Sequence, residues 1–129
     1  MSFLKIFILF SFSLCILFSC SGDKETLLIG KWKAKQIVND DGDLNDDQIS
    51  LTYLFTENGR FERIEDGRTE EGEWKLSDDK SRILFTYDEN KITREKTIKE
   101  LSDHTLILEG KVGKSNTKET LERKTHDTE

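Results

Sequence analysis

The sequence contains no proline and only two cysteines among its 129 residues. Its turns must therefore be made by Gly, Asn, Asp and Ser, which tolerate the backbone angles of tight turns. Both cysteines, Cys15 and Cys20, lie within the first twenty residues, so the remainder of the chain has no thiol for a disulfide, a nucleophile or a metal site. A domain of this size without disulfides must depend on its hydrophobic core.

Histidines are also scarce, and the 26 acidic residues outnumber the 20 basic ones. The formal net charge is −6, which fits poorly with binding to the anionic backbone of a nucleic acid. The two histidines are His104, in a predicted turn, and His126, in the tail, and neither lies near a Ser or Cys motif. Most of the many carboxylates fall on predicted outward faces. The sequence therefore predicts no catalytic site, no metal site and no cofactor, and hence a protein that is not an enzyme.

Long apolar runs are confined to the N-terminus. Lys5 is the only charged residue before residue 23, and the run 6–18 consists almost wholly of Ile, Leu, Phe, Ser and Cys. This run is shorter than the about 20 residues that cross a bilayer core. A basic start, an apolar stretch and a small residue before the break are typical of a secretory signal peptide. The segment Leu-Phe-Ser-Cys at 17–20 resembles the bacterial lipobox, in which the cysteine is acylated before the chain is cut in front of it. The alternatives are a plain signal peptide with an incidental cysteine and an uncleaved anchor helix.

The lipobox resemblance implies a lipid on Cys20 that tethers the protein to a membrane of the cell envelope. It divides the chain into a signal peptide (1–19), a lipidated tether (20–26), a β-domain (27–124) and a frayed tail (125–129). Stable anchoring takes two or more acyl chains, since each buried CH₂ contributes about 0.8 kcal/mol. Bacterial lipoproteins resemble this solution, with a diacylglyceryl thioether and often an N-acyl chain. No acidic residue directly follows Cys20. By resemblance to the sorting rules of Gram-negative lipoproteins, this favours the outer membrane, on its periplasmic or surface face.

Apolar and charged residues alternate through most of the β-domain, which predicts half-buried strands. In the first strand, 28–38, the even-numbered residues from Leu28 to Val38 share one face, and three lysines (Lys31, Lys33 and Lys35) occupy the other. A hairpin over 51–64 is best paired with Phe55 opposite Phe61, because this register keeps the apolar face together and places Gly59 in a left-handed turn position. Further strands are predicted up to 76, over 82–87, 91–101 and 105–109, and over 117–124 after a loose connection. Eight strands joined by short turns favour an all-β, antiparallel up-and-down barrel, which leaves no open edges.

The segment 39–47 is strongly acidic. Asp41, Asp43, Asn45 and Asp47 alternate as the oxygen ligands of a calcium-binding EF-hand loop do. The match then fails, because the sixth position holds Asp46 instead of glycine and the twelfth holds Thr52 instead of glutamate. The preferred interpretation is a solvated loop, with calcium binding as the alternative.

Several motifs occur in an order that resembles the lipocalin family. They are Gly30-Lys31-Trp32 on the first strand, the acidic loop, Phe55 to Phe61 as Phe-x-x-x-Gly-x-Phe, Gly72-x-Trp74, and the run 101–108 near the end. The pattern covers about residues 27–124 and is similar to small lipocalin-like domains of bacterial lipoproteins. The resemblance implies an eight-stranded barrel, sometimes with a cup for an apolar ligand. It also implies an arginine packed on the first-strand tryptophan, for which Arg123 is the candidate. The mature chain is shorter than typical lipocalins and has no disulfide pair.

Seven aromatic residues fall mainly on predicted inward faces, and they allow two functions. The first is a binding module in which these rings line a cavity for a small apolar or amphipathic molecule. The second is a barrel that the rings simply fill, whose loops or charged outer faces, including the three lysines, contact an envelope protein or an enzyme that it inhibits. The predicted ligand-binding residues are Trp32, Tyr53, Phe55, Phe61, Trp74, Phe85 and Tyr87.

Overall fold

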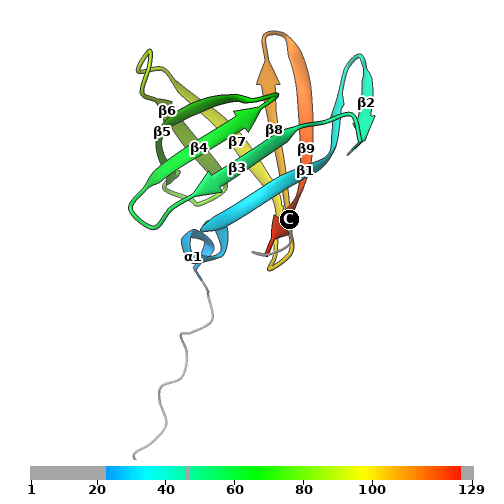
Figure 1. Ribbon diagram of the computed structural model, residues 1–129. Helices are drawn as coiled ribbons and strands as arrows, with labels where there is room; N and C mark the ends of the chain where they lie inside the picture. The colour runs from blue at the N-terminus through cyan, green and yellow to red at the C-terminus, as the bar shows by residue number, and fades with distance from the viewer. Residues whose placement is uncertain (1–22, 46, 126–129) are drawn as a thin grey trace, which may run out of the picture.

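The computed structural model describes residues 23–45 and 47–125, which form a barrel of antiparallel strands with a short helix at one end (Figure 1). The strands follow one another in the order β2-β1-β3-β4-β5-β6-β7-β8-β9, and β1 also pairs with β9. This last pairing closes a barrel of eight strands, β1 and β3 to β9, and confirms the predicted fold. The bounds are α1 Lys24–Leu28, β1 Gly30–Asn39, β2 Gly42–Asn45, β3 Leu51–Phe55, β4 Arg60–Glu65, β5 Arg68–Leu76, β6 Arg82–Tyr87, β7 Thr93–Leu101, β8 Thr105–Val112 and β9 Ser115–Lys124.

The two ends of the barrel differ. We call the end next to α1 the closed end; it carries the turns between β3 and β4, β5 and β6, and β7 and β8. The opposite end, called the open end, carries the β1–β2 hairpin and the turns after β4, β6 and β8. The predicted signal peptide, Cys20, the first residues of the tether and the end of the tail lie outside the described residues.

Helix α1 replaces part of the predicted tether and the beginning of the predicted first strand. The strand begins at Gly30, not at residue 28, and Leu28 instead ends the helix with its side chain fully buried. The Leu28 carbonyl accepts a hydrogen bond from Trp32 Nε1 at 2.9 Å. The helix thus brings an apolar side chain and an acceptor over the closed end, which a simple alternation of residues cannot reveal.

A β-bulge in β1 changes which residues point inward. The pairing with β9 shifts between Ala34 and Gln36, so Ile37 lies opposite Glu119 and Val38 lies opposite Lys118. Ile37 packs against the core, and Val38 consequently faces outward. The prediction that Val38 shares a face with Trp32 was therefore wrong, because the extra residue of a bulge reverses the alternation beyond it.

The acidic segment is also more regular than the predicted loop. Gly42–Asn45 forms β2, which pairs with the far end of β1. Asn39 Oδ1 accepts a hydrogen bond from the Asp41 amide at 2.8 Å, and Gly42 supplies a positive φ of 140°. The four residues of β2 are all exposed, so no apolar face marked this strand in the sequence.

The predicted register of the β3–β4 hairpin is confirmed. Phe55 lies opposite Phe61, and Gly59 takes a positive φ of 84°. By contrast, the connection between β8 and β9 is much tighter than expected. The two strands extend to Val112 and Ser115, which pair directly.

Candidate functional site

The seven aromatic residues predicted to bind a ligand all point into the barrel, and most of them contact one another. The Tyr53 and Phe55 rings stack with centroids 5.8 Å apart, and the Phe61 ring meets Phe85 edge-on at 5.0 Å. Trp74 and Tyr87 extend this group, with ring distances of 5.3 Å to Phe55 and 5.2 Å to Phe61 respectively. Tyr87 is only half-buried. The rings therefore pack into a continuous layer, and their role in ligand binding stays a prediction.

Trp32, the seventh aromatic residue, packs beneath a cation at the closed end. The guanidinium carbon of Arg123 lies 4.3 Å from the centroid of its ring. The same guanidinium donates hydrogen bonds to the carbonyls of Asp103 and Ile29, both at 2.7 Å, and to that of Leu27. A Cβ on Gly30 would lie 2.5 Å from Arg123 Nη1. The glycine of the Gly-x-Trp motif thus makes room for the arginine, whose assignment to Trp32 is confirmed.

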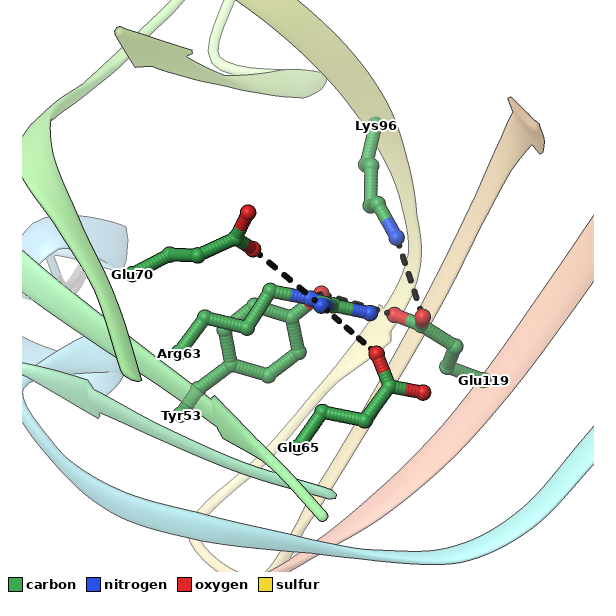
Figure 2. Close-up of polar contacts among 6 residues, drawn as sticks. All are labelled: Tyr53, Arg63, Glu65, Glu70, Lys96 and Glu119. Atoms are coloured by element: carbon green, nitrogen blue, oxygen red, sulfur yellow. Dashed lines mark hydrogen bonds and ion pairs between the residues drawn. The ribbon is translucent and has the colours of Figure 1, made fainter. Parts of the chain in front are cut away.

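Four polar side chains meet inside the barrel (Figure 2). The pairing of Tyr53 with Arg63, farther from the β3–β4 turn than Phe55, places them on the open side of the ring layer. We call Tyr53, Arg63, Lys96 and Glu119 the inner cluster; they come from β3, β4, β7 and β9. Glu119 Oε1 accepts a hydrogen bond from the Tyr53 hydroxyl at 3.1 Å, and its Oε2 accepts one from Lys96 Nζ at 2.9 Å. The side chain of Glu119 is 4% exposed and that of Lys96 is 13% exposed. Such deep burial of an ion pair requires both partners, since either charge alone would be strongly destabilising.

Arg63 connects the inner cluster to the rim of the barrel. Its Nε donates a hydrogen bond to the Tyr53 hydroxyl at 3.4 Å. Its Nη1 forms ion pairs with Glu65 at 2.9 Å and Glu70 at 3.4 Å. The Arg63 side chain is 19% exposed, whereas those of Glu65 and Glu70 are 44% and 40% exposed. Figure 2 shows these two rim glutamates on either side of the guanidinium, so a largely buried cation is paired with two half-exposed carboxylates.

The environment of the inner cluster shifts the pKa of three of its members. Burial, helped by the charge of Glu119, raises the pKa of Tyr53 to about 12. Burial by itself would lower the pKa of Lys96, but attraction to Tyr53 and Glu119 outweighs it and the pKa is raised. The pKa of Arg63 is likewise raised by its polar neighbours against the effect of burial. At neutral pH the cluster consequently holds a neutral phenol beside two cations.

Both the sequence and the fold are similar to those of known proteins. Residues 28–108 match the family of the lipocalin-like domain. The chain belongs to the lipocalin-like family. Among solved structures, its fold is similar to that of a lipocalin-like protein from Bacteroides uniformis, with a TM-score of 0.58 and 22% sequence identity, covering 76% of this chain and 99% of that chain. No curated protein matches this sequence.

The lipocalin-like barrel also has a groove on its outer surface. This outer groove has a volume of about 590 Å³ and crosses four neighbouring strands near the open end. Its outward-facing floor includes Val38, Lys118, Glu109 and Thr97, which pair in that order across β1, β9, β8 and β7. The complete lining is Val38, Asn39, Asp40, Thr97, Glu109, Gly110, Lys111, Asn116, Thr117 and Lys118. Lys31, Lys33 and Lys35 lie elsewhere on β1, and Lys35 forms an ion pair with Glu122 at 3.5 Å.

Two further features concern metals and membranes. Across residues 23–45 and 47–125, no three His, Cys, Asp or Glu side chains are grouped so that they could hold a metal ion. This range includes most of the acidic segment but omits Asp46. In the same part of the chain, no helix has the length and apolar character needed to span a bilayer.

The inner cluster was missed in the sequence, although a signal for it exists. Arg63 follows Phe61 at the spacing of one strand face, and Glu119 precedes Leu121 in the same way. Two charged residues thus continue faces that begin in the core. Their pairing could not be read from the sequence, because Tyr53 and Glu119 are 66 residues apart and Lys96 and Glu119 are 23 apart.

Proposed function

We propose that this lipocalin-like protein is a non-enzymatic binding protein that holds a small amphipathic molecule in the open half of its barrel. The observation that carries the proposal is the inner cluster. A barrel built only for stability would fill its interior with apolar side chains, because a buried ion pair contributes little net stability. Buried charges with strongly shifted pKa values are concentrated at functional sites.

Apolar groups beside the inner cluster supply a second kind of contact. Ile37 lies opposite Glu119 and is half-buried, and Tyr87 is half-buried at the edge of the ring layer. Small-molecule sites typically combine apolar walls with a few convergent polar groups. The open half of the barrel therefore suits a ligand with one polar end and one apolar end better than a purely apolar ligand.

We also propose that the protein is tethered through a lipid on Cys20 at the outer membrane of the cell envelope. The support comes from the lipobox-like sequence at the end of an apolar run. Only residues 20–23 precede α1, and four extended residues reach at most about 14 Å. Because α1 lies at the closed end (Figure 1), such a tether would hold the closed end near the bilayer. The open end would then exchange ligand with the aqueous phase.

Neighbouring residues of β1 allow a direct test of the ligand site. The chain from Ser21 onward contains every described helix and strand and the whole described core, so it can be studied in solution. We would titrate it with an apolar dye whose fluorescence depends on its environment. Ile37→Trp places a large ring inside the open half and should abolish saturable one-to-one binding. Val38→Trp, the matched control on the outer face, should bind dye as the unmodified domain does. Equal binding by all three proteins would refute a site inside the barrel.

A second candidate function is a protein-interaction or inhibitor module of the envelope. The outer groove favours it, because it offers a recessed surface with charges of both signs across four strands. The same pair of variants separates the two functions. Crosslinking in the envelope should capture a partner that is lost in Val38→Trp and retained in Ile37→Trp if the groove is the contact.

A further inference from the structure

We infer that the ligand carries an anionic head group, a carboxylate or a phosphate, which binds Arg63 in place of the two rim glutamates. The inference rests on the proposed function and names the chemical class of its ligand. Arg63 is the member of the inner cluster nearest to the rim, because its Nη1 is in contact with Glu65 and Glu70. An amphiphile entering from the open end would therefore meet this guanidinium first.

Without the rim glutamates Glu65 and Glu70, the inner cluster would carry a net positive charge. Arg63 and Lys96 contribute two positive charges, and Glu119 contributes one negative charge. Of the two Glu119 oxygens, one accepts a hydrogen bond from the Tyr53 hydroxyl and the other from Lys96 Nζ. Glu119 attracts Arg63 through its charge, but the direct ion pairs of Arg63 are with Glu65 and Glu70.

The rim glutamates are suited to being replaced. Their side chains are 44% and 40% exposed, so each can turn into solvent and be rehydrated. The largely buried guanidinium would lose its counter-charge in that movement unless a ligand anion took their place. A ligand carboxylate could then form two parallel hydrogen bonds with the guanidinium, the strongest arrangement that arginine offers to an anion. The net charge around Arg63 would stay compensated throughout.

A cationic head group fits the same residues less well. It would have to take Glu65 or Glu70 away from Arg63, and a side chain that is only 19% exposed would lose its counter-charge. Uncompensated buried charges are strongly unfavourable. The rim does contain an acidic hollow of about 340 Å³, lined by Thr69, Glu70, Glu71, Asp88 and Glu89. Apart from Glu70, which contacts Arg63, these carboxylates are exposed, and salt screens their repulsion of an anion at distances beyond about 8–10 Å.

The head group can be tested with amphiphiles that share one length of tail. The chain from Ser21 onward would be titrated calorimetrically with dodecanoate, dodecyl phosphate, dodecanol and dodecyltrimethylammonium, each as a monomer. The two anions should bind about tenfold or more tightly than dodecanol, as expected for a charge-assisted hydrogen bond, and the ammonium should bind most weakly. If dodecanol or the ammonium binds as tightly as the anions, the head-group inference is wrong while the proposed site survives. If none of the four binds, the proposed function fails as well.

Variants of the rim glutamates and of Arg63 should change dodecanoate binding in opposite directions. A merely structural role of these residues would not produce that result. Glu65→Gln combined with Glu70→Gln should strengthen dodecanoate binding several-fold and leave dodecanol unchanged, because the competing carboxylates are gone. Arg63→Met should remove the preference for dodecanoate over dodecanol. Arg60→Met is its matched control, since Arg60 lies on the same strand and pairs with Asp88 on the outer face. A preference that persists in Arg63→Met, or dodecanoate binding that is unchanged or weaker in the glutamine variant, would overturn the inference.

Discussion

Replacing Lys96 by methionine should destabilise the barrel far more than replacing any exposed lysine. The change removes the ammonium that contacts Glu119 at 2.9 Å and leaves a carboxylate that is 4% exposed with Tyr53 as its remaining hydrogen-bond donor. Methionine is close to lysine in length and apolar, so it fills the same space. The perturbation is therefore electrostatic and involves little change in packing.

The magnitude follows from two opposing effects. At the observed separation and an effective dielectric constant of about 20, the attraction within the pair is about 6 kcal/mol. Removing two charges from water offsets most of this, so that the intact pair contributes little, whereas removal of one partner typically costs about 3–5 kcal/mol. We expect Lys96→Met to lower the free energy of unfolding by about 4 kcal/mol. The double variant Lys96→Met/Glu119→Gln should lose about 2 kcal/mol less, because no buried charge is left unpaired.

Urea unfolding measures these differences, provided that the denaturant slope stays constant across the series. Lys99→Met is the matched control, because Lys99 is on the same strand, is 50% exposed and is 3.9 Å from Glu109. A pair of this kind contributes about 1 kcal/mol or less. If Lys96→Met loses no more stability than Lys99→Met, the pair is not buried in the barrel and the account of the inner cluster fails.

Three further predictions concern other parts of the fold. Because burial raises the pKa of Tyr53 from 10.0 to about 12, its contribution to stability should be complete below pH 10, fall by about 2 kcal/mol by pH 12 and fall by roughly 3 kcal/mol in all at higher pH. Phenolate absorbance that titrates near pH 10 in folded protein would contradict this. Arg123→Met should lower the free energy of unfolding by about 3 kcal/mol, since it removes three carbonyl contacts and the cation above Trp32, and an unchanged urea midpoint would show that these contacts are dispensable. Gly72→Ala should lose about 3 kcal/mol or more because its Cβ would lie 2.0 Å from a backbone oxygen. Gly110→Ala, which meets the flexible side chain of Lys96 at 3.1 Å, should lose less, and the reverse order in thermal melts would refute the steric argument.

Much of the fold could be predicted because the alternation of residues reports which side of a strand is buried. Phe55 and Phe61 set the register of their hairpin, since any other pairing would move one of them to the outside. The aromatic residues were placed inward correctly for the same reason. Resemblance to lipocalins also identified Arg123 as the partner of Trp32.

The remaining features depend on local geometry that leaves no periodic signal. The bulge in β1 exchanges Ile37 and Val38 between the two faces, yet both residues are apolar and either could be inward. Strand β2 is exposed along its whole length and so lacks an apolar face. In the inner cluster, Arg63 and Glu119 were visible as charges on inward faces, but their partners depend on the closure of the barrel.

The central claim is that the open half of the barrel binds an amphiphile through the inner cluster. A crystal structure of the chain from Ser21 onward with dodecanoate tests it most directly. We predict a carboxylate within hydrogen-bonding distance of Arg63, Glu65 and Glu70 turned toward solvent, and the tail along Ile37 and Tyr87. Dodecanoate bound in the outer groove against Val38, or a barrel that stays unchanged at saturating dodecanoate, would contradict the claim.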